Sequence, residues 1–202
     1  SSVAYTNSVG STNWSVSPGS LGSITSGGLF TPSAISAPTQ SASGNIVVVN
    51  GACTANYAIQ VYNMPTLSSP PAAVCDNSSV ALNADLTVSW SASAGGMSPA
   101  SGTSSTLTPP SLSSPTLNQN VTVTYTNGAC SATQVVRTDN AATFTTAPTA
   151  MCDAAGNTSD FNVDLGDGNV TWSQNMAGGS VSSTGVFDPA DIAQPTTNTN
   201  VT

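Results

Sequence analysis

The chain has 202 residues, of which only 5% are charged, and its formal net charge is −8. All nine acidic residues are Asp, Arg137 is the only cation, and there is no Glu, Lys or His. A negative chain with a single Arg cannot neutralise a row of phosphates, so we do not expect it to bind nucleic acid. No apolar run is long enough to span a bilayer, so we do not expect insertion into a membrane. Without His or Lys there is no base to activate a Ser or Thr, so we expect no enzyme.

Composition also predicts the fold class. Helices usually keep their outer faces in water with Glu, Lys and Arg, so a chain that lacks the first two is poorly suited to helical surfaces. Apolar residues still make up 38% of the chain. They alternate with Ser, Thr and Asn over short segments, which is typical of half-buried β-strands. We therefore expect an all-β protein.

The first repeat, residues 1–71, contains segments in which apolar and polar residues alternate as they do in strands. In chain order these are SSVAYTNSVGSTNWSVS, GGLFTPSAI, NIVVVNGAC and TANYAIQVY. The Pro-rich connector MPTLSSPP then leads to the second repeat, and its prolines should limit hinge freedom.

The second repeat, residues 72–148, is the one complete copy. Its two clearest strands are LTVSW and NVTVTYT. Their alternation places one set of apolar side chains on a common face: Leu86, Val88 and Trp90 in the first, and Val121, Val123 and Tyr125 in the second. Asn127-Gly128 follows the second strand, and we expect this pair to form a tight hairpin turn because both residues tolerate positive φ.

The third repeat, residues 149–202, contains DFNVDLGDGNVTW and TGVFDPADI and then stops. The period is defined by the cysteines, because Cys53 and Cys130 are 77 residues apart and so are Cys75 and Cys152. On this alignment the first repeat lacks its first segment and the third lacks its last strands. Two explanations stay open, a window cut from a longer array or a fibre subunit that a strand of the next subunit completes.

These repeats share an order of motifs. A Trp is followed by a Gly-x-Phe-x-Pro passage, found in the first and third, and then by a strand that ends in Gly-Ala-Cys, found in the first and second, where the second alternates as Val-x-Tyr-Thr. This order resembles the Ig-like β-sandwich repeats of large bacterial cell-surface adhesin and filament proteins, especially Bacteroidetes-type arrays. The resemblance covers essentially the whole chain. It implies tandem Ig-like β-sandwich modules, the outer two incomplete here, in an exported adhesive or filamentous protein, and it carries over no catalytic residue.

Four regularly spaced cysteines favour disulfides and an oxidising, extracellular setting. Cys75, Trp90 and Cys130 have the spacing of an immunoglobulin Cys-Trp-Cys set, but that pairing leaves Cys53 and Cys152 without partners. We prefer the two local pairs, Cys53 with Cys75 and Cys130 with Cys152, because they leave no cysteine over. A zinc site is not expected, since there is no CxxC and no His.

The third repeat also contains a candidate calcium site. Alternation in DFNVDLGDGN predicts that Asp160, Asn162 and Asp164 share the outer face of a strand, where oxygen ligands could hold calcium. The simpler interpretation is a solvated strand face followed by a Gly-rich turn, because the pattern of a calcium loop is incomplete. We therefore expect no obligatory cofactor, with calcium as the alternative.

The sequence contains six Asn-X-Ser/Thr acceptors for N-linked glycans: Asn13, Asn77, Asn120, Asn157, Asn169 and Asn200. That number is close to chance for this composition, but several acceptors recur at equivalent places in the repeats. Sugars attached at such strand starts and turns would help to keep a surface with so few charges soluble.

Together these observations predict a structural subunit or segment of an extracellular filament or surface fibre. Its partners would be copies of itself, arranged head to tail by strand complementation or as a longer array. The alternative is a carbohydrate- or calcium-dependent adhesin module, in which loops recognise the ligand.

Overall fold

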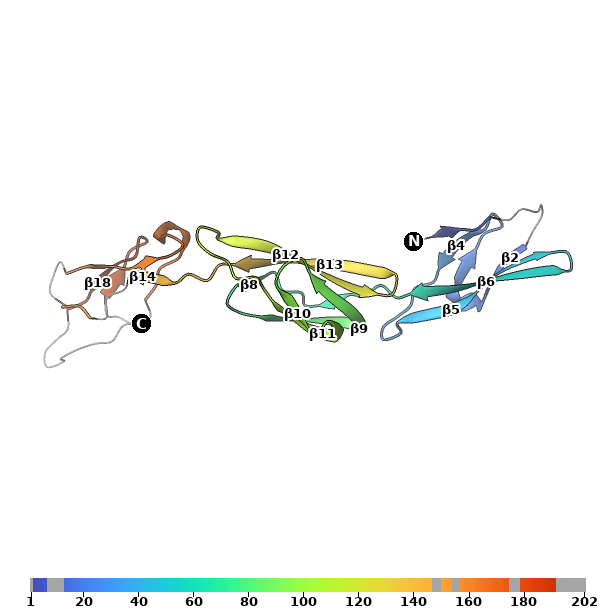
Figure 1. Ribbon diagram of the computed structural model, residues 1–202, viewed down its shortest axis with the longest axis horizontal. Coiled ribbons are helices and arrows are strands. Elements are labelled where there is room, and N and C mark those ends of the chain that lie inside the picture. The colour runs from blue at the N-terminus through green and yellow to red at the C-terminus, as the bar shows by residue number, and fades with distance from the viewer. Residues whose placement is uncertain (1, 7–12, 147–149, 154–156, 175–178, 192–202) are drawn as a thin grey trace. The chain divides into compact units, whose positions relative to one another are not determined.

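The computed structural model describes residues 2–6, 13–146, 150–153, 157–174 and 179–191 (Figure 1). Within these ranges the regular structure is β-strand apart from two short 3-10 helices, Gly19–Leu21 and Asp167–Asn169. The all-β expectation is therefore confirmed. The chain divides into two compact units, one formed by residues 1–72, 80–108 and 121–136, and the other by residues 73–79, 109–120 and 137–202.

In the first repeat the strands form two three-stranded sheets. The sheets have the orders β1-β4-β3 and β2-β5-β6. The bounds are β1 Val3–Ala4, β2 Asn13–Ser17, β3 Gly22–Ile24, β4 Leu29–Pro32, β5 Ser41–Asn50 and β6 Cys53–Tyr62. Leu21, Phe30 and Ile46 form the buried centre, and Trp14 packs against it while only partly buried.

The strands β10-β11-β9-β12-β13-β8 of the second repeat are neighbours in one seven-stranded sheet (Figure 1). Its seventh strand, β7, comes from the end of the first repeat and pairs with β9. The bounds are β7 Leu67–Ser68, β8 Ala73–Cys75, β9 Val80–Ala92, β10 Gly96–Ser98, β11 Ser101–Thr108, β12 Asn118–Asn127 and β13 Cys130–Asp139. The predicted alternation is confirmed, since the apolar residues expected on the common face are all buried: Leu86, Val88, Trp90, Val121, Val123 and Tyr125.

The connector at the end of the first repeat is paired with a strand of the second. Its residues Leu67–Ser68 form β7 and pair antiparallel with Ala84 and Asn83 of β9. The connector is thus bound into the sheet of the second repeat by backbone hydrogen bonds, which restrict it more directly than its prolines do.

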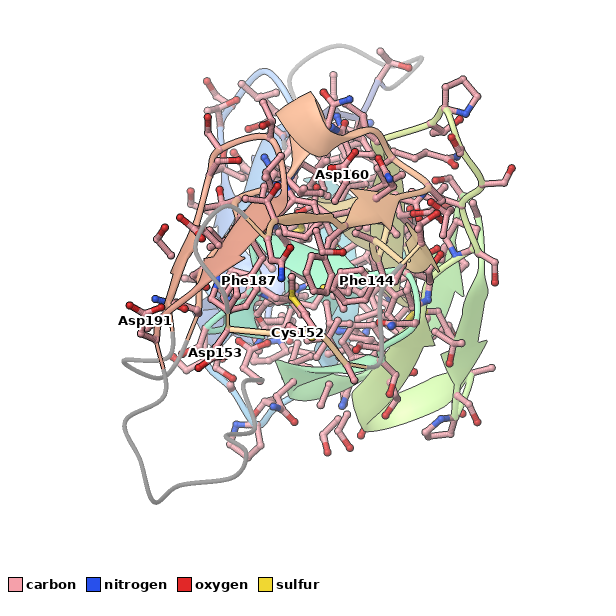
Figure 2. The ribbon with its side chains drawn as sticks, turned by 90° about the vertical axis from the view of Figure 1, so that its left-hand side faces the viewer. Phe144, Cys152, Asp153, Asp160, Phe187 and Asp191 are labelled. Atoms are coloured by element: carbon pink, nitrogen blue, oxygen red, sulfur yellow. The ribbon has the colours of Figure 1, made fainter. Side chains whose placement is uncertain are left out.

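The third repeat contains shorter strands. Strand β14, from the end of the second repeat, pairs with β16, and β15, β18 and β17 form a second sheet. The bounds are β14 Phe144–Thr146, β15 Ser159–Asp160, β16 Asn162–Val163, β17 Gly179–Val181 and β18 Val186–Pro189. Aromatic rings connect the two, because Phe161 contacts both Phe144 and Phe187 at centroid distances of 6.0 and 6.2 Å. Figure 2 shows the side chains of this repeat, with Phe144 and Phe187 labelled.

The first and third repeats use glycine in the same way beside the Trp. Gly28 and Gly185 both have φ +81°, and each accepts a backbone hydrogen bond, from Tyr5 and Phe161 respectively. A Cβ at Gly28 would collide with the carbonyl of Tyr5, and a Cβ at Gly185 would lie 2.8 Å from the ring of Trp172. The positive φ and the lack of space for a Cβ both require glycine at these two positions. The first and third repeats therefore share a local structure as well as a sequence motif.

Candidate functional site at the repeat boundaries

An Asp–Thr clamp fastens the start of the second repeat. The carboxylate of Asp85 on β9 accepts hydrogen bonds from the Thr66 backbone N–H at 2.8 Å and from the Thr66 hydroxyl at 2.9 Å. In return the Asp85 N–H donates to the Thr66 carbonyl at 3.1 Å. Thr66 immediately precedes β7, so three hydrogen bonds hold the connector where it enters the new sheet.

The same clamp recurs one period later. The carboxylate of Asp164 accepts from the Thr143 N–H at 2.9 Å and from its hydroxyl at 2.8 Å, and the Asp164 N–H donates to the Thr143 carbonyl at 3.0 Å. Ser114 adds a hydrogen bond to the Asp164 carbonyl at 2.7 Å. The bond from the Thr143 N–H, helped by the Thr143 hydroxyl, holds the pKa of Asp164 below its ordinary value.

The hairpin between β12 and β13 meets the end of the first repeat through Asn127. Its side-chain amide donates to the carbonyl of Gln40 at 2.7 Å and to the carbonyl of Asn63 at 2.9 Å. Asn127 and Asn63 are both buried, with exposures of 7% and 8%. This contact joins residues 64 and 87 positions apart in sequence.

The expected Asn127-Gly128 turn is therefore wrong in one respect. Asn127 is the last residue of β12, and Gly128 with Ala129 forms the turn. Only Gly128 has a positive φ, of 57°. Here the Asn uses the two donors of its amide on the carbonyls of Gln40 and Asn63, and it does not adopt the left-handed region.

Two more groups of this hairpin contact Tyr62 at the end of β6. Gly128 lies against the Tyr62 ring so closely that a Cβ would overlap it. The thiol of Cys130 donates to the Tyr62 carbonyl at an Sγ–O distance of 3.5 Å. On the other side, the Asn63 amide donates to the Thr39 carbonyl at 3.0 Å, so the receiving surface is itself held in place.

A further carboxylate closes the second repeat. Asp76, which follows β8, accepts from the N–H of Leu112 at 2.8 Å and from the N–H of Ala141 at 2.9 Å. Its own N–H donates to the Asp139 carbonyl at 2.8 Å. The hydrogen bond from Leu112, followed by that from Ala141, holds the pKa of Asp76 below its ordinary value. Asp76 thus ties together three segments that are distant in sequence.

All four cysteines are free thiols in the structure, so neither of the preferred pairs, Cys53–Cys75 and Cys130–Cys152, is formed. The immunoglobulin-type pairing is also missing, for a clear reason. Cys130 begins β13, whereas Cys75 is paired with Asp139 at its other end. Ten residues of strand span roughly 30 Å, far beyond the 7 Å limit between Cα atoms for a disulfide.

The three residues of the calcium hypothesis do not lie on one strand. Asp160 belongs to β15 and Asn162 to β16, which pair with different partners, and both carboxylate oxygens of Asp164 accept hydrogen bonds from Thr143. Figure 2 labels Asp160 in the third repeat. Among the described residues there is no group of three or more His, Cys, Asp or Glu that could hold a metal ion. Calcium binding remains a prediction that these contacts do not test.

Of the six glycan acceptors, the five described ones are exposed: Asn13, Asn77, Asn120, Asn157 and Asn169. Asn200 lies outside the described residues. The Asn169 amide donates to the Leu165 carbonyl at 2.8 Å, so this acceptor would have to give up a hydrogen bond to carry a sugar. Glycosylation itself stays a prediction.

Sequence reasoning missed the two clamps and the role of Asn127. Asp85 and Asp164 were available as a signal, because each follows a Thr by about twenty positions, Thr66 of the connector in one case and Thr143, 77 residues later, in the other. The repeated Asn-Gly-Ala-Cys at residues 50–53 and 127–130 was a second signal. Asn-Gly is a general signal for a hairpin turn, and it does not reveal that the Asn127 amide contacts the first repeat. Only a structure shows what that amide contacts.

Comparison with known proteins does not assign the chain to a family. No family model matches and no curated protein matches. Solved structures that share some likeness include domains 4 and 5 of the S-layer protein SbsC, at 13% identity and TM-score 0.26, covering 64% of this chain and 71% of that one. Drosophila N-cadherin EC1-4 matches at 11% identity and TM-score 0.32, covering 93% of this chain and 59% of that one.

Another is protocadherin gamma B7 extracellular cadherin domains 1-4, at 11% identity and TM-score 0.34, covering 89% of this chain and 59% of that one. The chain thus spans less than two thirds of the length of either cadherin-type structure. Likenesses this distant carry no information about function. In the described parts of the chain, no helix has the length and apolarity needed to cross a membrane.

Proposed function

We propose that this chain is a structural segment of an extracellular surface filament or array, in which Ig-like repeats are fastened end to end. The observation that carries the proposal is the Asp–Thr clamp, which appears with the same three hydrogen bonds at Thr66 and Asp85 and again at Thr143 and Asp164. A device repeated at successive boundaries serves the connection between repeats and not the recognition of one ligand.

The surface chemistry supports the same proposal. The chain has one cation and no His, so it offers little for nucleophilic or acid–base chemistry. Its exposed faces carry Ser, Thr and Asn, and five of its glycan acceptors are exposed. A sparsely charged, sugar-compatible surface over linked β-sheets suits a load-bearing component outside the cell. Head-to-tail contact between copies, with a strand passed from one to the next, is the finer form of the proposal.

Negative-stain electron microscopy of the purified chain over a range of concentrations tests this function. We expect end-to-end strings that lengthen with concentration. A matched variant with Asp85→Asn and Asp164→Asn should give less regular strings, because each clamp inside the chain loses its carboxylate. Single dispersed chains at every concentration would contradict head-to-tail assembly. Binding to a glycan array, or heat released with millimolar calcium chloride, would favour the adhesin alternative instead.

A further inference from the structure

The outer edge of β6 in the first repeat is open. In the order β2-β5-β6, strand β5 pairs with β6 along its whole length, from Ser41 opposite Tyr62 to Asn50 opposite Cys53. No strand in the described ranges pairs with the other edge. Near the C-terminal end of β6, Ile59 and Val61 are only partly buried although they pack against the core of the repeat. The first repeat therefore leaves apolar surface beside unpaired backbone groups.

The second repeat shows what covers the equivalent edge. There β8 pairs in parallel with the end of β13, with Ala73 opposite Arg137 and Cys75 opposite Asp139. Val136 and Thr138, which lie 77 positions after Ile59 and Val61, are completely buried, at 0% exposure. The same two positions are thus closed where a β8-type strand is present and half open where it is not.

A second, separate feature indicates that the same kind of segment, a β8-type strand followed by an Asp, fits this edge. In the second repeat the Asp76 carboxylate, just after β8, accepts from the N–H groups of Leu112 and Ala141. The equivalent residues of the first repeat, 77 positions earlier, are Ile35 and Met64. The hydrogen bonds found among the described residues include none donated by these two N–H groups. By equivalence with Leu112 and Ala141, these are the two N–H groups that a carboxylate after a β8-type strand would bind.

We infer that the open edge of β6 is a docking site for a short extended segment with the chemistry of residues 73–76: small, aliphatic, Cys, Asp. It would run parallel to the end of β6, with its Cys opposite Tyr62 and its Asp on the N–H groups of Ile35 and Met64. The inference rests on the proposed function in one respect, because the segment is taken to belong to another repeat of the same kind.

The position of Cys130 gives the docked segment a covalent reporter. Its thiol lies 3.5 Å from the Tyr62 carbonyl, and paired residues of neighbouring strands are about 5 Å apart, so a Cys opposite Tyr62 comes close to Cys130. In the second repeat the equivalent Cys75 lies opposite Asp139, at the other end of β13 from Cys130. A segment bound at β6 is therefore distinguishable from one that displaces β8.

The test uses a synthetic peptide of residues 71–78, PAAVCDNS, whose Cys carries 5-thio-2-nitrobenzoate as a mixed disulfide. The chain has Cys53, Cys75 and Cys152 replaced by Ser. The Cys130 thiolate attacks the peptide sulfur, the new S–S bond forms, the bond to the aromatic thiol breaks, and the coloured thiolate leaves, so no external oxidant is needed. Control peptides have the same composition in scrambled order, or Asp76→Ala.

We expect the native peptide to react about tenfold faster than the scrambled one, because docking raises the local concentration of its disulfide, with the Asp76→Ala peptide slower than the native peptide. Equal rates for native and scrambled peptides would overturn the site. The second readout uses the unmodified chain and a Cys75→Ser peptide, which should slow hydrogen exchange at residues 60–62. Unchanged exchange there would also overturn it. Neither assay requires the chain to form filaments. The docking site can therefore be refuted without refuting the proposed function, and the proposed function without refuting the site.

Discussion

Replacing Asn127 by Ala removes the contact between the β12–β13 hairpin and the first repeat. Two hydrogen bonds are lost, of 2.7 and 2.9 Å, to the carbonyls of Gln40 and Asn63. The Gln40 carbonyl still accepts from the Asn63 N–H, whereas the Asn63 carbonyl, in a residue only 8% exposed, is left without that donor. Two bonds at about 1 kcal/mol each, plus the cost of one unsatisfied buried carbonyl, predict a loss of about 3 kcal/mol.

The chain contains its own control. Asn50 occupies the same place in the first repeat, before the same Gly-Ala-Cys, but it is exposed. Asn50→Ala should change the free energy of unfolding by less than about 0.5 kcal/mol, as is usual for surface positions. Asn127→Asp should cost at least as much as Asn127→Ala, because a carboxylate cannot donate and would face two carbonyls.

The assay is urea unfolding at neutral pH, followed by circular dichroism, for the chain and its three variants. Hydrogen exchange at residues 39–40 and 62–63 then shows whether the loss is local to the boundary. Equal destabilisation by Asn127→Ala and Asn50→Ala, or a loss below about 0.5 kcal/mol for Asn127→Ala, would refute the reasoning, because the contact would then contribute no more than an ordinary surface side chain.

Three further outcomes are expected. Gly51→Ala should lower the free energy of unfolding by about 1 kcal/mol for its positive φ alone, since its Cβ meets nothing within 4 Å. Gly128→Ala should lower it clearly more, because its Cβ overlaps the Tyr62 ring. Equal losses of stability measured by calorimetry would contradict this. Thr138→Val should stabilise the chain by about 1 kcal/mol in urea unfolding, because the Thr138 hydroxyl is buried without a hydrogen-bond partner, and a loss would show an unseen partner. The pKa values of Asp76 and Asp164 are lowered by folding, so their contribution is present above the ordinary value of 3.8 and is lost as pH falls below it. Acid titration of the melting temperature checks this, and Asp76→Asn with Asp164→Asn should flatten the profile.

The strands could be predicted because their signal is local. Every second residue is apolar throughout β9 and from Val121 to Tyr125 in β12, and Leu86, Trp90 and Val123 are buried as that pattern requires. The connector was harder, because Pro-rich composition predicts a spacer and says nothing about the pairing of Leu67 with Ala84.

The site could not be predicted for a different reason. The alternation with Asn162 predicts an outer strand face for Asp164, but Thr143 donates hydrogen bonds to both of its carboxylate oxygens. Asn127 was assigned to a turn because Asn-Gly is so strongly associated with hairpins. In both cases the residue type was informative, and the partner depended on the approach of a segment distant in sequence, which composition and spacing do not encode.

The Asp–Thr clamps contain no positive charge. Each carboxylate is held by a neutral backbone N–H and a neutral hydroxyl, and the one ion pair found among the described residues, Arg137 with Asp139, lies outside both clamps. Dissolved ions weaken attraction between opposite charges, and they also weaken repulsion between like ones. A chain with a net charge of −8 and boundaries of this kind should hold its repeats together at least as firmly in molar salt as in dilute buffer.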